Sequence, residues 1–175
     1  MAAVIIASFS AEDITRHPQQ LAALMHACVH DGASIGYVLP FTIADSEAFW
    51  TAKVLPGVLE GTRALLVAIR DGAIVGSVQL DYDTPPNQPH RAEVRKLLVH
   101  PDFRRQGIGR ALMAEVEKRA AGLKRNLLTL DTRTGDSAEP LYVSLGYRIV
   151  GVIPGYCLDP FAPKLDSTTV MYKAL

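Results

Sequence analysis

The chain has 175 residues, 18 basic and 18 acidic side chains, and a hydrophobic content of 49%, a composition typical of one compact domain. A formal net charge of zero argues against nucleic acid as a partner, and the longest apolar runs fall far short of the roughly 20 residues that span a membrane. The cysteines, Cys28 and Cys157, lie far apart in the sequence, so we expect reduced thiols and a cytoplasmic protein.

The N-terminal third predicts one strand followed by helices. Residues 4–9 favour a strand, and Ser10 with the acidic residues after it supplies capping chemistry for a helical region that reaches about His30. A second helix is expected over residues 45–54, with a stop at Pro56-Gly57. The bulky segment 33–50 suggests a lid over a small pocket.

The middle of the chain predicts a hairpin and then a strand, a turn and a helix. Residues 64–69 and 73–80 are apolar runs joined by Arg70-Asp71-Gly72, and Asp-Gly is a strong hairpin signal. After a loop over residues 83–88, residues 93–99 predict a strand that leads into a glycine-containing turn, and a helix follows from Ile108.

The last third predicts shorter elements of both kinds. Strands are expected over residues 127–130, 147–153 and 169–172, with a short helix over residues 137–145. The order of strands and helices predicts an α/β fold, a mixed sheet flanked by helices, and one domain over residues 1–175.

The turn before the long helix reads Arg104-Arg105-Gln106-Gly107-Ile108-Gly109-Arg110. Its glycines let the backbone approach a ligand, and the helix N-terminus presents free N–H groups, so we predict that a phosphate or pyrophosphate binds here. A P-loop would need Lys and then Ser or Thr where Arg110 and Ala111 stand, and a dinucleotide fingerprint would need a small residue at Leu112. The plain alternative is an ordinary strand-to-helix turn.

The pattern Arg-x-x-Gly-x-Gly behind a Val-His-Pro turn resembles the pyrophosphate loop of the GNAT acyltransferases, which carry acetyl groups from acetyl-CoA to amines. The resemblance implies a GNAT fold with a mixed, mostly antiparallel sheet, and acetyl-CoA as cosubstrate. Many members carry an Asn where this chain has Gly135, and Ser137 is expected to replace it. The residues implied to hold CoA are Leu97, Leu98, Val99, Arg104, Arg105, Gln106, Gly107, Ile108, Gly109, Arg110 and Ser137.

Three side chains are candidates for chemistry. An amine must lose a proton before it attacks a thioester, and carboxylates can accept that proton. Glu93 precedes the glycine turn and Asp131 ends the next strand, so the two converge on one cleft if their strands are neighbours. The plain alternative is solvated or ion-paired carboxylates. Tyr142 lies in a segment that resembles the GNAT tyrosine which protonates the CoA thiolate, and the alternative for it is packing.

The acceptor is suggested by a further resemblance. Segments at residues 30–37, 92–97, 130–132 and 155–157 are similar to the tabtoxin resistance branch of the superfamily, which acetylates a hydroxyl of a β-lactam amino-acid toxin. This implies a small-molecule acceptor, an amine or a hydroxyl of a toxin or similar antibiotic, in a pocket lined by Ser34, Tyr37 and Tyr156.

Two other functions stay open. One is a protein or peptide N-acetyltransferase, and the other is a CoA-binding module without turnover. The histidines lack the spacing of a metal site, so no metal is expected, and the chain is expected to act as a monomer or a homodimer.

Overall fold

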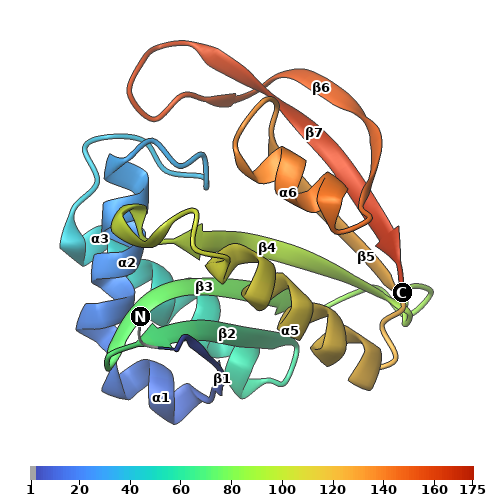
Figure 1. Ribbon diagram of the computed structural model, residues 1–175, viewed down its shortest axis with the longest axis horizontal. Helices are drawn as coiled ribbons and strands as arrows, with labels where there is room; N and C mark the ends of the chain where they lie inside the picture. The colour runs from blue at the N-terminus through green and yellow to red at the C-terminus, as the bar shows by residue number, and fades with distance from the viewer. Residues whose placement is uncertain (1–2) are drawn as a thin grey trace.

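The computed structural model describes residues 3–175, and its seven strands form one mixed sheet in the order β1-β2-β3-β4-β5-β7-β6 (Figure 1). Only β4 and β5 run parallel; the other neighbours described are antiparallel. This confirms the predicted sheet. The strands are β1 Ile5–Phe9, β2 Arg63–Arg70, β3 Ala73–Asp81, β4 Arg91–Val99, β5 Leu127–Arg133, β6 Arg148–Leu158 and β7 Leu165–Ala174.

Helices cover both faces of the sheet. On one face α5 packs against β2, β3 and β4 through Leu112, Met113 and Val116, and on the other α2 and its neighbours bury Leu24 and Trp50. Within residues 3–175, no helix combines the length and apolar character needed to cross a membrane. The α-helices are α1 Ala11–Arg16, α2 Pro18–His30, α3 Ile43–Phe49, α4 Leu55–Leu59, α5 Ile108–Gly122 and α6 Ala138–Ser144.

Local capping explains where the first helices begin. Ser10 and Asp13 form a capping box at the start of α1, as the sequence predicts. The predicted helical region to His30 is divided at His17, because Pro18 has no N–H to continue the α1 hydrogen-bond pattern and instead occupies the first turn of α2.

The predicted helix stop at Pro56-Gly57 is wrong. The chain passes from α3 through a π-helical turn, residues 50–54, in which the Leu55 N–H donates to the Trp50 carbonyl, and stays helical to Leu59. Pro56 lies in the first turn of α4, where a backbone N–H needs no helical partner, so proline starts this helix rather than ending the one before.

The β2–β3 hairpin is confirmed, whereas the C-terminal strands are longer than predicted. Asp71 and Gly72 both have positive φ, 50° and 78°, as a tight two-residue turn requires. β6 continues through Pro154 because it is an edge strand, where a missing N–H costs no ladder bond, and the register with β7 shifts between Ile153 and Cys157.

Two buried tyrosines make the stability of the fold sensitive to alkali. Tyr142 and Tyr147 pack edge to face with ring centroids 5.8 Å apart, and burial raises the pKa of both well above the usual 10.0. Above that pH the unfolded chain loses these protons while the folded chain keeps them, so the free energy of unfolding falls as pH rises. Urea unfolding measures this free energy, which should fall less steeply between about pH 9 and 11 in Tyr147→Phe than in the wild type. Equal slopes of unfolding free energy against pH in the two proteins would contradict this.

Candidate active site

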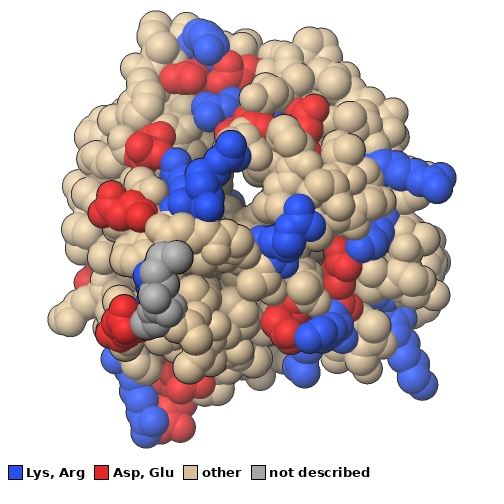
Figure 2. All heavy atoms as spheres, viewed as in Figure 1, with Lys and Arg blue, Asp and Glu red and all other residues tan. Residues whose placement is uncertain are grey.

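A cleft of about 560 Å³ separates β4 and α5 from β5 and α6. Figure 2 shows it as an opening near the centre of the molecule, with Lys and Arg side chains on both sides. Strand pairing explains the opening, because β4 and β5 pair only over Arg91–Leu127, Ala92–Leu128 and Glu93–Thr129. Beyond Glu93 the two strands diverge.

A β-bulge in β4 shapes one wall of the cleft. Ser77 pairs with Leu98 and Gln79 with Arg95, so β4 contains one more residue than β3 over this stretch. Lys96, at the bulge, has a φ of 49°. The bulge changes which residues of β4 face α5. Before it the even-numbered Val94 packs on that side, and after it the odd-numbered Leu97 and Val99 do. Three of the residues predicted to hold CoA, Leu97, Leu98 and Val99, line the cleft.

The glycine-containing turn forms the end of the cleft at the start of α5. Gly107 has a φ of 82°, and no side chain caps the helix N-terminus that begins after it. Arg104 is held by the Val99 carbonyl and by the carboxylate of Asp31. The residues of the turn that line the cleft are Arg104, Arg105, Gly107, Ile108, Gly109 and Arg110.

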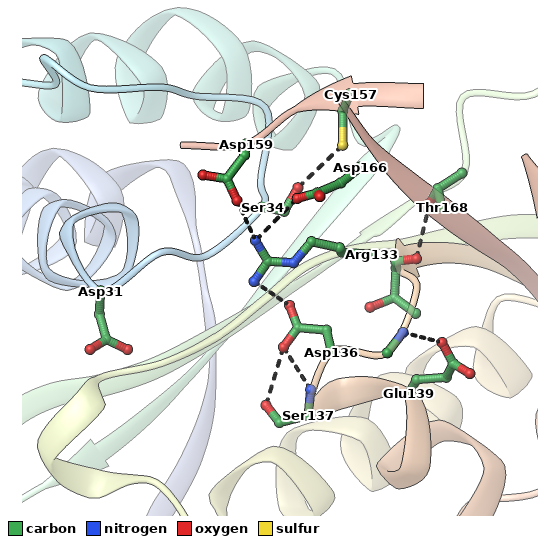
Figure 3. Close-up of polar contacts among 12 residues, drawn as sticks. Asp31, Ser34, Arg133, Asp136, Ser137, Glu139, Cys157, Asp159, Asp166 and Thr168 are labelled. Atoms are coloured by element: carbon green, nitrogen blue, oxygen red, sulfur yellow. Dashed lines mark hydrogen bonds and ion pairs between the residues drawn. The ribbon is translucent and has the colours of Figure 1, made fainter. Parts of the chain in front are cut away.

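Gln106 is the one predicted turn residue that does not line this cleft. Its side-chain oxygen accepts a hydrogen bond from Arg70 instead. Ser137, predicted to replace the missing Asn, does line the cleft, and its backbone N–H donates to the Asp136 carboxylate at 2.6 Å (Figure 3).

Gly107→Ala is expected to weaken acetyl-CoA binding about tenfold, because alanine pays ~1–2 kcal/mol in the left-handed conformation and the free turn relaxes out of it. Titration calorimetry with acetyl-CoA measures the change. Gly61→Ala is the matched control, because Gly61 has a φ of 70°, has nothing within 4 Å of an added Cβ, and lies outside the cleft. This variant should lower the free energy of unfolding but leave the Kd for acetyl-CoA unchanged. Equal affinities for Gly107→Ala and the wild type would contradict a binding role for the turn.

The structure brings both predicted carboxylates to the cleft. Glu93 pairs with Thr129, and Asp131 follows two residues later, so the two side chains project from the same face of the sheet. The Thr168 hydroxyl donates to Asp131 Oδ2 at 2.8 Å. Glu93 Oε1 lies 3.8 Å from Arg95 Nε, a long and half-exposed pairing, and both Glu93 and Asp131 line the cleft.

Tyr142, on α6, also lines the cleft, although only 6% of its surface is exposed. Burial, together with the nearby negative charges of Asp136 and Asp131, raises the pKa of its hydroxyl well above the usual value. The phenol therefore stays protonated at neutral pH and can donate a proton or a hydrogen bond.

Of the three residues predicted to bind the acceptor, two reach the cleft. Ser34 and Tyr156 line it, and Ser34 Oγ lies 3.4 Å from Cys157 Sγ. Tyr37 does not line it, because its ring packs on Phe41 with the centroids 4.7 Å apart. Polar and charged cleft residues that sequence reasoning missed include Asp31, Arg95, Lys96, Arg133, Asp136, Cys157 and Thr168.

The loop after α2 and the tip of the β6–β7 hairpin lie side by side (Figure 1), and residues of both β6 and the loop line the cleft. The Leu39 N–H donates to the Pro160 carbonyl at 3.1 Å, and the Phe161 ring lies so close to Gly32 that an added Cβ would be 2.8 Å from it. These contacts, with the Ser34–Cys157 pair, join the loop and the hairpin tip into a roof over the cleft.

Ion pairs hold the hairpin tip to β5. Arg133 lies between Asp136 on one side and Asp159 and Asp166 on the other, at 3.2, 3.8 and 3.7 Å (Figure 3). Lys164 adds a second cation, 3.2 Å from Asp166. The roof is therefore anchored by charges beside the cleft.

No group of three His, Cys, Asp or Glu side chains within residues 3–175 is arranged to hold a metal ion. His26 and His30 stack on each other with ring centroids 4.0 Å apart, and His30 Nε2 hydrogen-bonds the Phe41 carbonyl.

Residues 61–149 match the model of a family described as acetyltransferase (GNAT) domain. An acetyltransferase of Pectobacterium atrosepticum is 38% identical over 89 residues, 50% of this chain and 60% of that protein. An acetyltransferase of Yersinia enterocolitica is 40% identical over 86 residues, 47% and 56% of the two chains. The matches thus span less than two thirds of these relatives.

Solved structures share the whole fold. A putative acetyltransferase from Acinetobacter baylyi superposes with a TM-score of 0.81 at 15% identity, over 100% of this chain and 94% of that one. A putative acetyltransferase from Salmonella typhimurium, solved with its cofactor acetyl-CoA, superposes with a TM-score of 0.76 at 19% identity, over 99% of this chain and 94% of that one. At these identities the similarity establishes the fold alone.

Proposed function

The chain belongs to the GNAT acetyltransferase family, and from that premise we propose that residues 1–175 act as one domain that transfers acetyl from acetyl-CoA to a small molecule. The acceptor group is an amine or a hydroxyl. The observation that carries the proposal is the cleft itself, in which the uncapped start of α5, the unpaired edge of β4, two carboxylates and a protonated tyrosine lie together.

The cleft suits acetyl-CoA, whose thioester supplies the activated acetyl group. The start of α5 offers backbone N–H groups and the positive end of its dipole to a pyrophosphate, with Arg105 and Arg110 beside it. Leu97 and Val99, on either side of Leu98, which pairs with Ser77 of β3, offer backbone groups that β5 does not use, and the amide groups of a pantetheine arm can pair with these.

The side chains divide the proton transfers between them. Glu93 and Asp131 accept the proton that the acceptor amine or hydroxyl gives up as it attacks, directly or through water. Tyr142, whose phenol is protonated at neutral pH, donates its proton to the departing thiolate. A backbone N–H beside the bulge at Lys96 stabilises the carbonyl oxygen of the thioester as it gains negative charge.

The roof favours a small acceptor over an extended peptide. The Leu39–Pro160 hydrogen bond and the Phe161–Gly32 contact join the loop after α2 to the hairpin tip, and an extended polypeptide would have to pass this joined roof to enter the cleft. A hydroxylated β-lactam amino acid, or a similar antibiotic, is the finer proposal for the acceptor, and it rests on the resemblance of residues 30–37 and 155–157.

The test is release of free CoA from acetyl-CoA with a panel of acceptors: amino acids, hydroxylated β-lactam analogues, polyamines and short peptides. We expect release with one class of small molecule. Release with peptides alone would replace this proposal with a protein acetyltransferase. Binding of acetyl-CoA in calorimetry without release by any acceptor would replace it with a CoA-binding module.

A further inference from the structure

Lys96 has a place in the cleft that the proposed chemistry does not use. Its side chain leaves β4 at the bulge and ends at the loop after α2, where Nζ donates to the Ile35 carbonyl at 2.8 Å. On another side Nζ lies 5.5 Å from the centre of the Phe49 ring. The bond to Ile35 joins strand β4 to a loop 61 residues away in the sequence.

That loop forms part of the roof. Ser34, Ile35 and Gly36 line the cleft, and the hairpin tip contacts the same loop at Gly32, Ser34 and Leu39. The hairpin thus holds the loop from one side and Lys96 holds it from the other. Lys96 lies on β4, whose edge beyond Glu93 is not paired with β5 and is the proposed binding site of acetyl-CoA. The hairpin does not lie on that strand.

The surroundings of Lys96 make its charge costly and therefore sensitive to pH. Burial, with the cations Arg95 on β4 and Arg63 on β2, lowers the pKa of Lys96 to about 8, while Asp131 on β5 and Glu93 on β4 act in the opposite direction. A buried ammonium is retained where partners compensate its lost hydration, and here the Ile35 carbonyl and the Phe49 ring, on α3, supply that compensation.

We propose that Lys96 is a positioning residue for the acceptor: its amino group fixes the Ile35 carbonyl and so holds residues 33–37 in the shape that binds the acceptor. The inference rests on the proposed function, since it concerns the same cleft. It adds that acceptor affinity depends on the charge of Lys96, whereas the affinity for acetyl-CoA does not.

The first test follows the loop without any acceptor. Hydrogen exchange is measured for peptides that cover residues 31–41, where the Ala33 and Leu39 N–H groups are hydrogen-bonded, in the wild type, Lys96→Met and Lys96→Arg at one pH. Met keeps the length and the β-carbon, so the strain at the bulge is unchanged. We expect faster exchange in Lys96→Met and near wild-type exchange in Lys96→Arg, whose guanidinium can still donate to Ile35.

Arg95→Met is the matched control for exchange. Arg95 is the neighbouring cation on the bulge, but it contacts Asp81 and Glu93 rather than the loop. At a pH well below 8, where Lys96 keeps its proton with or without Arg95, its loss should leave exchange at residues 31–41 unchanged. Equal exchange in Lys96→Met and the wild type would overturn the proposal, and so would exchange in Lys96→Arg as fast as in Lys96→Met. Since this measurement needs no turnover, it stands whether or not the enzyme activity is found.

The second test is kinetic and uses the amine or alcohol of the panel that gives the fastest CoA release. Lys96→Met should raise KM for that acceptor about tenfold, as expected when a charge-assisted hydrogen bond is lost, and leave the Kd for acetyl-CoA unchanged. At each pH we take the ratio of the acceptor KM of the variant to that of the wild type. Ionisation of the acceptor changes both KM values equally and so drops out of the ratio. It should be largest below about pH 8 and shrink above it, as wild-type Lys96 loses its proton. A ratio that does not change with pH would mean that Lys96 only packs, and would overturn the proposal.

Discussion

Glu93→Gln combined with Asp131→Asn is expected to lower kcat by about 10²- to 10⁴-fold, the usual contribution of general acid–base catalysis. Both amides keep the size of the carboxylates they replace but cannot accept a proton from the acceptor. The Kd for acetyl-CoA should stay unchanged, because neither side chain belongs to the turn or to the β4 residues that we propose to bind CoA. Single-turnover release of CoA, with calorimetry for the affinity, separates the two quantities.

The single variants say how the two carboxylates act. If Glu93 and Asp131 work on the same proton, through one chain of hydrogen bonds, each single change should cost nearly as much as the double change. Glu60→Gln with Asp71→Asn is the matched control, since both side chains are exposed and outside the cleft. A double variant that keeps the wild-type kcat would refute the catalytic role of both groups.

Tyr142→Phe is expected to lower kcat about a hundredfold, because the departing thiolate loses its proton donor. The change removes one oxygen and keeps the buried ring, so the melting temperature should move little. The expected effect is on kcat and not on the KM for either substrate. Steady-state kinetics at saturating acetyl-CoA measure it.

Tyr147→Phe is the control for this prediction. Tyr147 is as deeply buried as Tyr142 and touches it edge to face, but it does not line the cleft. Its loss should therefore leave kcat close to that of the wild type. An unchanged kcat in Tyr142→Phe would show that this tyrosine only packs, and the proton of the thiolate would have to come from water.

Several features of the fold and of the site follow from residues close together in the chain. The capping box of Ser10 and Asp13, the Asp71-Gly72 turn and the uncapped start of α5 behind Gly107 each depend on hydrogen bonds or dihedral angles within a few residues. The sequence can therefore predict them, and with them the β2–β3 hairpin and the glycine-containing turn before α5.

The sequence predicted less well where a local signal has two meanings. A proline such as Pro56 can follow the end of a helix or lie in the first turn of one. Here the π-helical turn over residues 50–54 leads into α4, so Pro56 lies in the first turn of that helix. Likewise an aromatic residue such as Tyr37 can line a pocket or pack, and its contact with Phe41 decides for packing.

What the sequence by itself determined about this protein is its family and the residue types of its cleft: the glycine-containing turn, Glu93, Asp131 and Tyr142. Only the tertiary structure decided how they are arranged. The bulge at Lys96, the end of β4–β5 pairing at Glu93 and the contact of Leu39 with Pro160 join segments far apart in the chain. The physical reason is that strand register and loop contacts are set by which distant surfaces pack together, and no short stretch of sequence carries that information.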